Sequence, residues 1–163
     1  MGDASATPAP LPGSRIDSDG FLELLQTDWR RHWFALVPLG GPLVVRLNVE
    51  GSDAWSRDLE LLRTLDGVAA VMVPKASSAD GLRHVHVELE GTPILPLIES
   101  AMGLRAIDEI AGVPGIARLA LGHLDFMADT GIACDDQELE LIPLRFAVAM
   151  ATRIANLPPA IDG

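Results

Sequence analysis

Four apolar segments alternate with amphipathic segments over residues 42–125, and this alternation is the main structural signal of the chain. The apolar segments read PLVVRLN (42–48), GVAAVMVPK (67–75), PILPLIE (93–99) and IARLALGHLD (116–125). They are apolar almost throughout, as is typical of parallel strands that are covered on both faces. The pattern therefore predicts an α/β protein with a parallel sheet.

Helices are predicted between and around these strands. Ser52 is a suitable N-cap for a helix over 53–65, and apolar residues at helical spacing predict further helices over 19–37, 100–113 and 135–156. Pro143 is a candidate kink in the last of them. The segment 77–89 is ambiguous, because HVHVELE alternates like a strand whereas SSAD resembles the start of a helix.

The composition restricts the class of protein. The chain has 163 residues, enough for a single domain over 20–163, and residues 1–19 are rich in Ala, Pro, Gly, Ser and Asp, which predicts a flexible tail. A net charge of −11 argues against binding nucleic acid or an anionic membrane surface. No apolar run approaches the ~20 residues of a membrane span, and the first residues do not resemble a signal peptide. The lone Cys134 allows no disulfide within the chain, so we expect a cytoplasmic protein.

Each predicted strand ends in polar or charged residues. Arg46 and Asn48 close the first, Lys75 the second, Glu99 the third and Asp125 the fourth. The successive intervals are 29 residues from Arg46 to Lys75, 24 from Lys75 to Glu99 and 26 from Glu99 to Asp125. A (β/α)₈ barrel of ~250 residues has units of roughly 31 residues, with its functional residues at the carboxyl ends of the strands. The spacing therefore predicts successive units of such a barrel.

Glu99 and Asp125 are candidate metal ligands, because neighbouring parallel strands bring them to the same mouth of the barrel. Two carboxylates with water in the remaining positions suit Mg²⁺ or Mn²⁺, whereas a zinc site favours His or Cys. The alternative is that each carboxylate caps the next helix or pairs with Arg46 or Lys75.

Five ordered motifs resemble one family. VVRLNVEGSDAWSRDLELL (44–62), GVAAVMVPKASS (67–78), LPLIESAMGL (95–104), ALGHLDFMADTGI (120–132) and RIANLPPAIDG (153–163) are similar to the citrate lyase β-subunit-like branch of the HpcH/HpaI aldolase superfamily. The similarity covers about residues 43–163. It implies a (β/α)₈ barrel that binds a divalent metal, usually Mg²⁺, and that cleaves or forms carbon–carbon bonds in 3-hydroxy-acyl-CoA esters such as citryl-, malyl- or citramalyl-CoA.

The resemblance also implies roles for individual residues. The glutamate of the LIE motif falls on Glu99 and the aspartate of the glycine–x–x–aspartate motif falls on Asp125, and both would be metal ligands. Arg46 falls on a substrate-contacting arginine and is the candidate catalytic cation, suited to an enolate or a carboxylate. Lys75 is a second candidate for substrate binding, with a salt bridge to a neighbouring carboxylate as the alternative.

Several other polar residues have less specific signals. His84 and His86 would point to different sides of a helix, which argues against a metal role. His123 lies beside Asp125 and is a candidate site-lining residue, and for Asp129 we favour helix capping or loop ordering. Cys134 is interpreted as a bystander thiol rather than a nucleophile.

The chain also departs from the family pattern. The opening LFVPG strand and the acidic DLED motif do not occur, and the sequence stops just after AIDG, so it supplies about strands three to seven of the barrel. An open barrel exposes sheet edges and apolar faces, which predicts a homo-oligomer or a partner chain that completes the barrel. A metal-dependent lyase acting on CoA esters is the leading hypothesis. The alternatives are a non-catalytic fragment or assembly subunit, and a pyruvate-type class II aldolase.

Overall fold

The computed structural model describes residues 43–162, which belong to a compact unit over Pro42–Gly163. The predicted tail over 1–19 and the predicted helix over 19–37 lie outside the described residues. The strands are β1 (Leu43–Arg46), β2 (Val68–Val73), β3 (Ile94–Ile98), β4 (Ala120–Leu121) and β5 (Ile161–Asp162). The helices are α3 (Asp53–Leu62), α4 (Ala79–Glu88), α5 (Ala101–Arg105), α6 (Ile107–Ala111), α7 (His123–Thr130) and α8 (Ile142–Ile154), with a 3₁₀ turn η2 (Leu139–Leu141) before α8.

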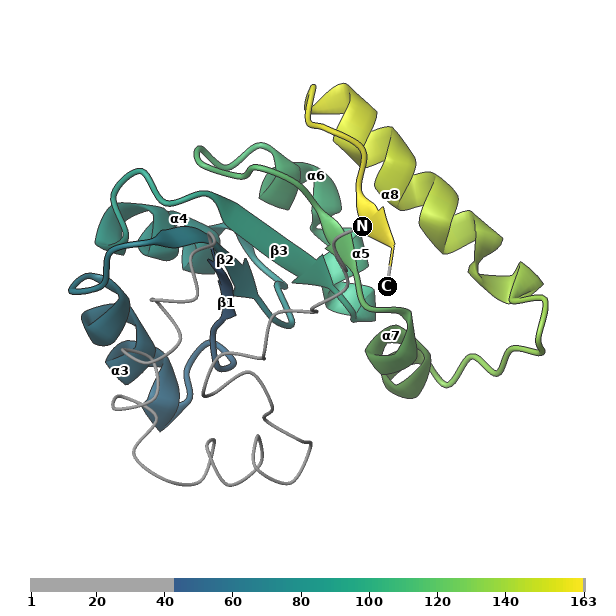
Figure 1. The fold of residues 1–163 in the computed structure, drawn as a ribbon. Coiled ribbons are helices and arrows are strands. Elements are labelled where there is room, and N and C mark those ends of the chain that lie inside the picture. The colour runs from purple at the N-terminus through teal and green to yellow at the C-terminus, as the bar shows by residue number, and fades with distance from the viewer. Residues whose placement is uncertain (1–42, 163) are drawn as a thin grey trace, which may run out of the picture. The chain divides into compact units, whose positions relative to one another are not determined.

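The five strands form one parallel sheet in the order β1-β2-β3-β4-β5, which is their order along the chain (Figure 1). Helical connections link successive neighbours, as parallel pairing requires. The arrangement is a parallel half-barrel with helices, and the prediction of a partial (β/α)₈ barrel is confirmed.

The two faces of the sheet carry different residues. Strand residues of the main core pack with the apolar faces of the helices; they include Val71, Val73, Ile94 and Ile98. The opposite face of the sheet is the inner face of the half-barrel. On it the strand pairing places Arg46 beside Met72, Met72 beside Leu95, and Leu97 beside Ala120. Side chains alternate along a strand, so Glu99 follows Leu95 and Leu97 onto this inner face.

The ambiguous segment 77–89 is helix α4. Ser78 is its N-cap and accepts a hydrogen bond from the backbone N–H of Gly81. Leu82, Val85 and Leu89 are buried, a three-to-four-residue spacing that only a helix brings to one face. The strand-like alternation of HVHVELE is overridden by this packing. Helix α3 follows its prediction closely, with Ser52 accepting from the N–H of Trp55 at 3.3 Å.

The segment 116–125, predicted to hold the fourth strand and its exit loop, does contain β4, but the strand is short and Asp125 does not close it. Only Ala120–Leu121 forms a regular strand, Ile116 makes an isolated bridge to Ile94, and helix α7 begins at His123. Gly122 donates its N–H to the carbonyl of Ile98 and accepts the N–H of Phe126, so the ladder ends and the helix starts at one residue. Asp125 therefore lies in the first turn of α7 rather than at a strand end.

Two helix predictions also need correction. The segment 100–113 forms two short helices, α5 and α6, separated at Ala106, whose backbone leaves the helical region with φ −95° and ψ 8°. Pro143 does not kink a long helix. It lies in the first turn of α8, where backbone N–H groups have no partner within the helix, so the N–H that proline lacks is not missed.

Among the helices of residues 43–162, none has both the length and the apolar character needed to cross a membrane.

Candidate functional site

Glu99 lies at the carboxyl end of β3 and is 2% exposed. One carboxylate oxygen, Oε1, accepts the backbone N–H of Lys75 at 2.8 Å and lies 3.8 Å from Nη2 of Arg46. A buried carboxylate is costly without such partners. The three residues come from the ends of three neighbouring strands, β1, β2 and β3, so the sheet itself assembles this part of the site.

The second oxygen of Glu99, Oε2, faces Gly122. The register pairs Leu97 with Ala120 and Ile98 with Leu121, which brings Gly122 opposite Glu99 one residue later. A Cβ atom on residue 122 would lie 2.8 Å from Oε2. Within residues 43–162 no hydrogen bond to Oε2 is found, and this oxygen lies so close to Gly122 that a side chain on residue 122 would not fit.

Lys75 contacts both predicted metal ligands. Its backbone N–H binds Glu99, and its ammonium Nζ lies 3.9 Å from Oδ1 of Asp125. Lys75 has a positive φ of 48°, an uncommon conformation for a residue with a side chain. This backbone geometry directs its amide toward Glu99. The pairings that the sequence offered as the alternative to a metal site are thus present, since Glu99 lies near Arg46 and Asp125 lies near Lys75, both at long distances. The side chains of Arg46, Lys75 and Asp125 are more than half exposed.

Glu99 does not cap the helix that follows it. Ser100 is the N-cap of α5 and accepts the N–H of Gly103 at 3.1 Å. Asp129 reaches across from α7 and accepts the N–H of Ala101 at 2.8 Å. The interpretation of Asp129 as a helix-capping residue is therefore confirmed, whereas the contacts of Glu99 are with Lys75 and Arg46.

The donor set fits a small oxygen-preferring cation. Glu99 and Asp125 are two carboxylates that both contact Lys75, Glu99 through the backbone N–H at 2.8 Å and Asp125 through the ammonium at 3.9 Å. No group of three or more His, Cys, Asp or Glu side chains within residues 43–162 is arranged to hold a metal ion. Two carboxylates alone match Mg²⁺, which keeps several waters when bound, better than Zn²⁺.

The histidines separate into different environments. His84 is exposed on α4, whereas the Nδ1 atom of His86 is buried without a hydrogen-bond partner in the described part of the chain, next to Gly115. His123 is the first residue of α7, and its Nε2 atom lies 3.8 Å from Oε1 of Glu138.

Sequence reasoning missed two features of the site. The first is the contact of Gly122 with Glu99, which a glycine at the end of an apolar strand could have indicated. The second is the pair of ion pairs that Arg145 forms with Glu138 and Asp162, which an arginine within the apolar run PLRFAVAMA could have indicated.

Cys134 is expected to react slowly with alkylating reagents. Burial, followed by the carboxylate of Glu140, raises the pKa of the Cys134 thiol, so less of it is the reactive thiolate at a given pH. The rate with iodoacetamide at pH 7.5 should fall below that of the same thiol in the urea-unfolded chain, and the midpoint of the pH–rate profile should lie at higher pH in the folded protein. A rate equal to that of the unfolded chain would contradict this environment.

Comparisons with known proteins agree with this architecture. Residues 31–162 match the HpcH/HpaI aldolase/citrate lyase family. A hydroxypyruvate/pyruvate aldolase of Paraburkholderia phytofirmans is 29% identical over 121 residues, which are 70% of this chain and 46% of that protein.

Solved structures share the fold. RipC from Yersinia pestis is 27% identical with a TM-score of 0.71, covering 91% of this chain and 65% of that one. The citrate lyase β subunit of Mycobacterium tuberculosis, complexed with oxaloacetate and magnesium, is 27% identical with a TM-score of 0.62, covering 73% and 53%. This chain thus spans less than two thirds of each of these relatives. The match over residues 31–162 shows that the chain belongs to the HpcH/HpaI aldolase/citrate lyase family.

Proposed function

We propose that this chain carries the metal- and carboxylate-binding part of a magnesium-dependent carbon–carbon lyase site. The observation that supports the proposal most directly is the buried carboxylate of Glu99, which has one oxygen held by Lys75 and Arg46 and the other beside Gly122. The family contains lyases and aldolases, and a citrate lyase β subunit in that family is complexed with magnesium.

Glu99 and Asp125 would hold the ion. Bound Mg²⁺ would supply Lewis-acid stabilisation for a carbonyl oxygen of the substrate. The Lys75 amide keeps the Glu99 carboxylate in one orientation, with Oε1 toward Lys75 and Oε2 toward Gly122. The Lys75 ammonium, more than half exposed, is free to contact a substrate carboxylate or to remain paired with Asp125.

Arg46 is the proposed catalytic cation. Its guanidinium lies on the inner face at the end of β1, 3.8 Å from Glu99, and more than half of its side chain is exposed. A guanidinium binds two oxygens of a carboxylate or enolate at once, so Arg46 would stabilise the negative charge that develops when the carbon–carbon bond breaks. A lysine at this position would lack the planar fork.

CoA esters of 3-hydroxy acids are the proposed substrates. One structure of the M. tuberculosis citrate lyase β subunit contains magnesium, acetoacetate and coenzyme A; it is 26% identical, with a TM-score of 0.63, and covers 73% of this chain and 44% of that one. Retro-Claisen or retro-aldol cleavage of a citryl-, malyl- or citramalyl-type ester would use the carboxylate-binding groups described here. These groups bind the acid portion of the substrate, whereas recognition of CoA is a separate requirement.

A pyruvate-type aldolase is the second candidate, since the curated relative at 29% identity is a hydroxypyruvate/pyruvate aldolase. The same carboxylate pair and Arg46 would then act on a free oxo acid. Release of free CoA or acetyl-CoA from the three esters, measured against pyruvate formation from hydroxy-oxo acids, distinguishes the two. A chain that binds Mg²⁺ and cleaves neither class would support an assembly role that needs a partner chain.

Calorimetric titration with Mg²⁺ tests the metal site. Glu99→Gln and Asp125→Asn each remove one anionic ligand, and each is expected to weaken Mg²⁺ binding by at least about tenfold. Glu109→Gln, an exposed carboxylate on α6, is the matched control and should bind like the wild type. Absence of Mg²⁺ binding by the wild type, or equal binding by all three variants, would rule out this site.

A further inference from the structure

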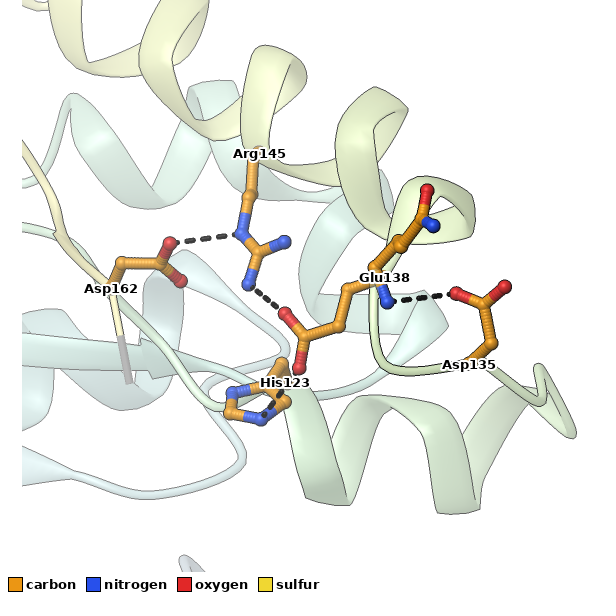
Figure 2. Close-up of polar contacts among 6 residues, drawn as sticks. His123, Asp135, Glu138, Arg145 and Asp162 are labelled. Atoms are coloured by element: carbon orange, nitrogen blue, oxygen red, sulfur yellow. Dashed lines mark hydrogen bonds and ion pairs between the residues drawn. The ribbon is translucent and has the colours of Figure 1, made fainter.

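Arg145 joins several elements beside the proposed site. From the second turn of α8, its Nη2 atom contacts Oε2 of Glu138 at 2.6 Å and its Nε atom contacts Oδ2 of Asp162 at 2.9 Å. The other oxygen of Glu138 lies 3.8 Å from Nε2 of His123. Figure 2 shows the guanidinium between the two carboxylates, with His123 on the far side of Glu138. Arg145 therefore contacts β5 directly, through Asp162, and is linked to α7 through Glu138.

The arm toward α7 reaches the helix at its first residue. His123 starts α7, and Asp125 is two residues later in the same turn. The N-cap of α7 is Gly122, which provides no side chain to cap the helix. The opposite half of α7 is held by Asp129 through the N–H of Ala101. Contacts from outside the helix thus reach both halves of α7: Lys75 lies 3.9 Å from Asp125 itself, and Glu138 contacts His123 two residues earlier in the same turn.

The backbone conformation of the loop before α8 fixes the position of the Glu138 side chain. Glu138 has φ 50° and ψ 34°, a left-handed conformation that costs of order 1 kcal/mol or more for a residue with a side chain. Asp135 stabilises the loop, since its carbonyl accepts the N–H of Glu138 at 3.1 Å and its carboxylate accepts the N–H of Gln137 at 2.8 Å. The loop therefore presents the Glu138 carboxylate in a defined position between Arg145 and His123.

The Arg145 guanidinium carries a permanent positive charge. Hydrogen bonds to Glu138 and then to Asp162 raise the pKa of the Arg145 guanidinium, so the group stays charged at every pH at which the protein is folded. About a third of the Arg145 side chain is exposed, and charge-assisted hydrogen bonds of this length are stronger than neutral ones. His123 is largely buried, which limits the positions that its ring can adopt.

We propose that Arg145 and Glu138 are positioning residues that hold the first turn of α7, and with it Asp125, against the inner end of β3. The inference rests on the proposed function for the part that concerns Mg²⁺. The part that concerns α7 stands on the contacts alone. Neither residue touches the substrate or the metal in this proposal, and both act through His123.

Two substitutions separate the two ion pairs of Arg145. Glu138→Ala removes the link to α7, and Asp162→Ala removes the contact with β5. Hydrogen exchange of the metal-free protein should show the α7 amides from Phe126 onward exchanging about three- to fivefold faster in Glu138→Ala, the effect of losing one polar contact that is longer than a hydrogen bond. Asp162→Ala should leave these amides within about twofold of the wild type. Equal acceleration in both variants, or none in Glu138→Ala, would overturn the proposal.

Arg145→Met should reproduce the effect of Glu138→Ala, and Arg153→Met on the same helix is its matched control, since Arg153 is exposed and has no ion pair within the described residues. If Arg145→Met fails to fold, Glu138→Ala decides the outcome. Amides of α4 serve as the internal reference and should not change.

Calorimetry with Mg²⁺ then tests the link to the site. Glu138→Ala should weaken binding by about tenfold, whereas Asp162→Ala should not. Faster exchange in α7 with unchanged Mg²⁺ affinity would overturn the link between α7 and Asp125. A wild type that binds no Mg²⁺ would refute the proposed metal function, and the exchange data would still decide whether Arg145 and Glu138 hold α7.

Discussion

Gly122→Ala is expected to weaken Mg²⁺ binding by ten- to a hundredfold, the range seen when the support of a metal ligand is lost. The new Cβ would lie 2.8 Å from Oε2 and 2.9 Å from Cβ of Glu99, both closer than real Cβ contacts allow. Glu99 is buried and cannot move into solvent, and rotation of its side chain would relieve the overlap at Oε2 but not at Cβ, so the backbone of Glu99 or residue 122 must shift and the carboxylate must change its position. Overpacking of this kind also costs about 1–3 kcal/mol of folding free energy.

Gly112→Ala is the matched control. Its Cβ would meet only the carbonyl oxygens of Asp108 and Glu109 at 3.5 and 3.6 Å, which is ordinary van der Waals contact. Both glycines have negative φ values, −105° at Gly122 and −82° at Gly112, so alanine introduces no backbone strain at either. Calorimetry on both variants isolates the steric effect on Glu99. Wild-type affinity in Gly122→Ala would show that Oε2 of Glu99 does not contribute to the ion site.

Ile98→Ala is expected to lower the free energy of unfolding by about 3 kcal/mol, within the 2–5 kcal/mol typical of large-to-small substitutions in a core. Ile98 is 0% exposed in the main apolar core, on the helix-facing side of β3. No rearrangement of a parallel strand between two neighbours easily fills the cavity. For a domain of this size the corresponding fall in Tm is about 10 °C, measurable by thermal denaturation followed by circular dichroism.

Ile154→Ala makes the same substitution at the end of α8, where the side chain is 71% exposed. We expect a change within about 0.5 kcal/mol, because little apolar surface is removed from contact. A large destabilisation by Ile154→Ala would indicate that another chain or segment covers this surface in solution. Comparable losses in both variants would contradict the core assignment of Ile98.

The sequence by itself determined the parallel α/β architecture. Strands β1, β2 and β3 are short apolar runs rich in Val, Ile and Leu that alternate with amphipathic segments, so their existence and order followed from the pattern. The family followed from five motifs in order, and the match over residues 31–162 confirms it. The boundaries of short elements could not be predicted from the pattern. The segments HVHVELE and IARLALGHLD are locally compatible with a strand or a helix, and only packing selects one of them.

The tertiary structure alone decided how the site is supported. Strand register places Gly122 opposite Glu99, and register depends on pairing between segments more than twenty residues apart. The left-handed conformation of Lys75, the cap that Asp129 gives to α5 and the Arg145–Glu138 pair likewise join distant parts of the chain. Sequence patterns report local periodicity, whereas the environment of a buried carboxylate is made by neighbours that are adjacent only after the sheet has formed.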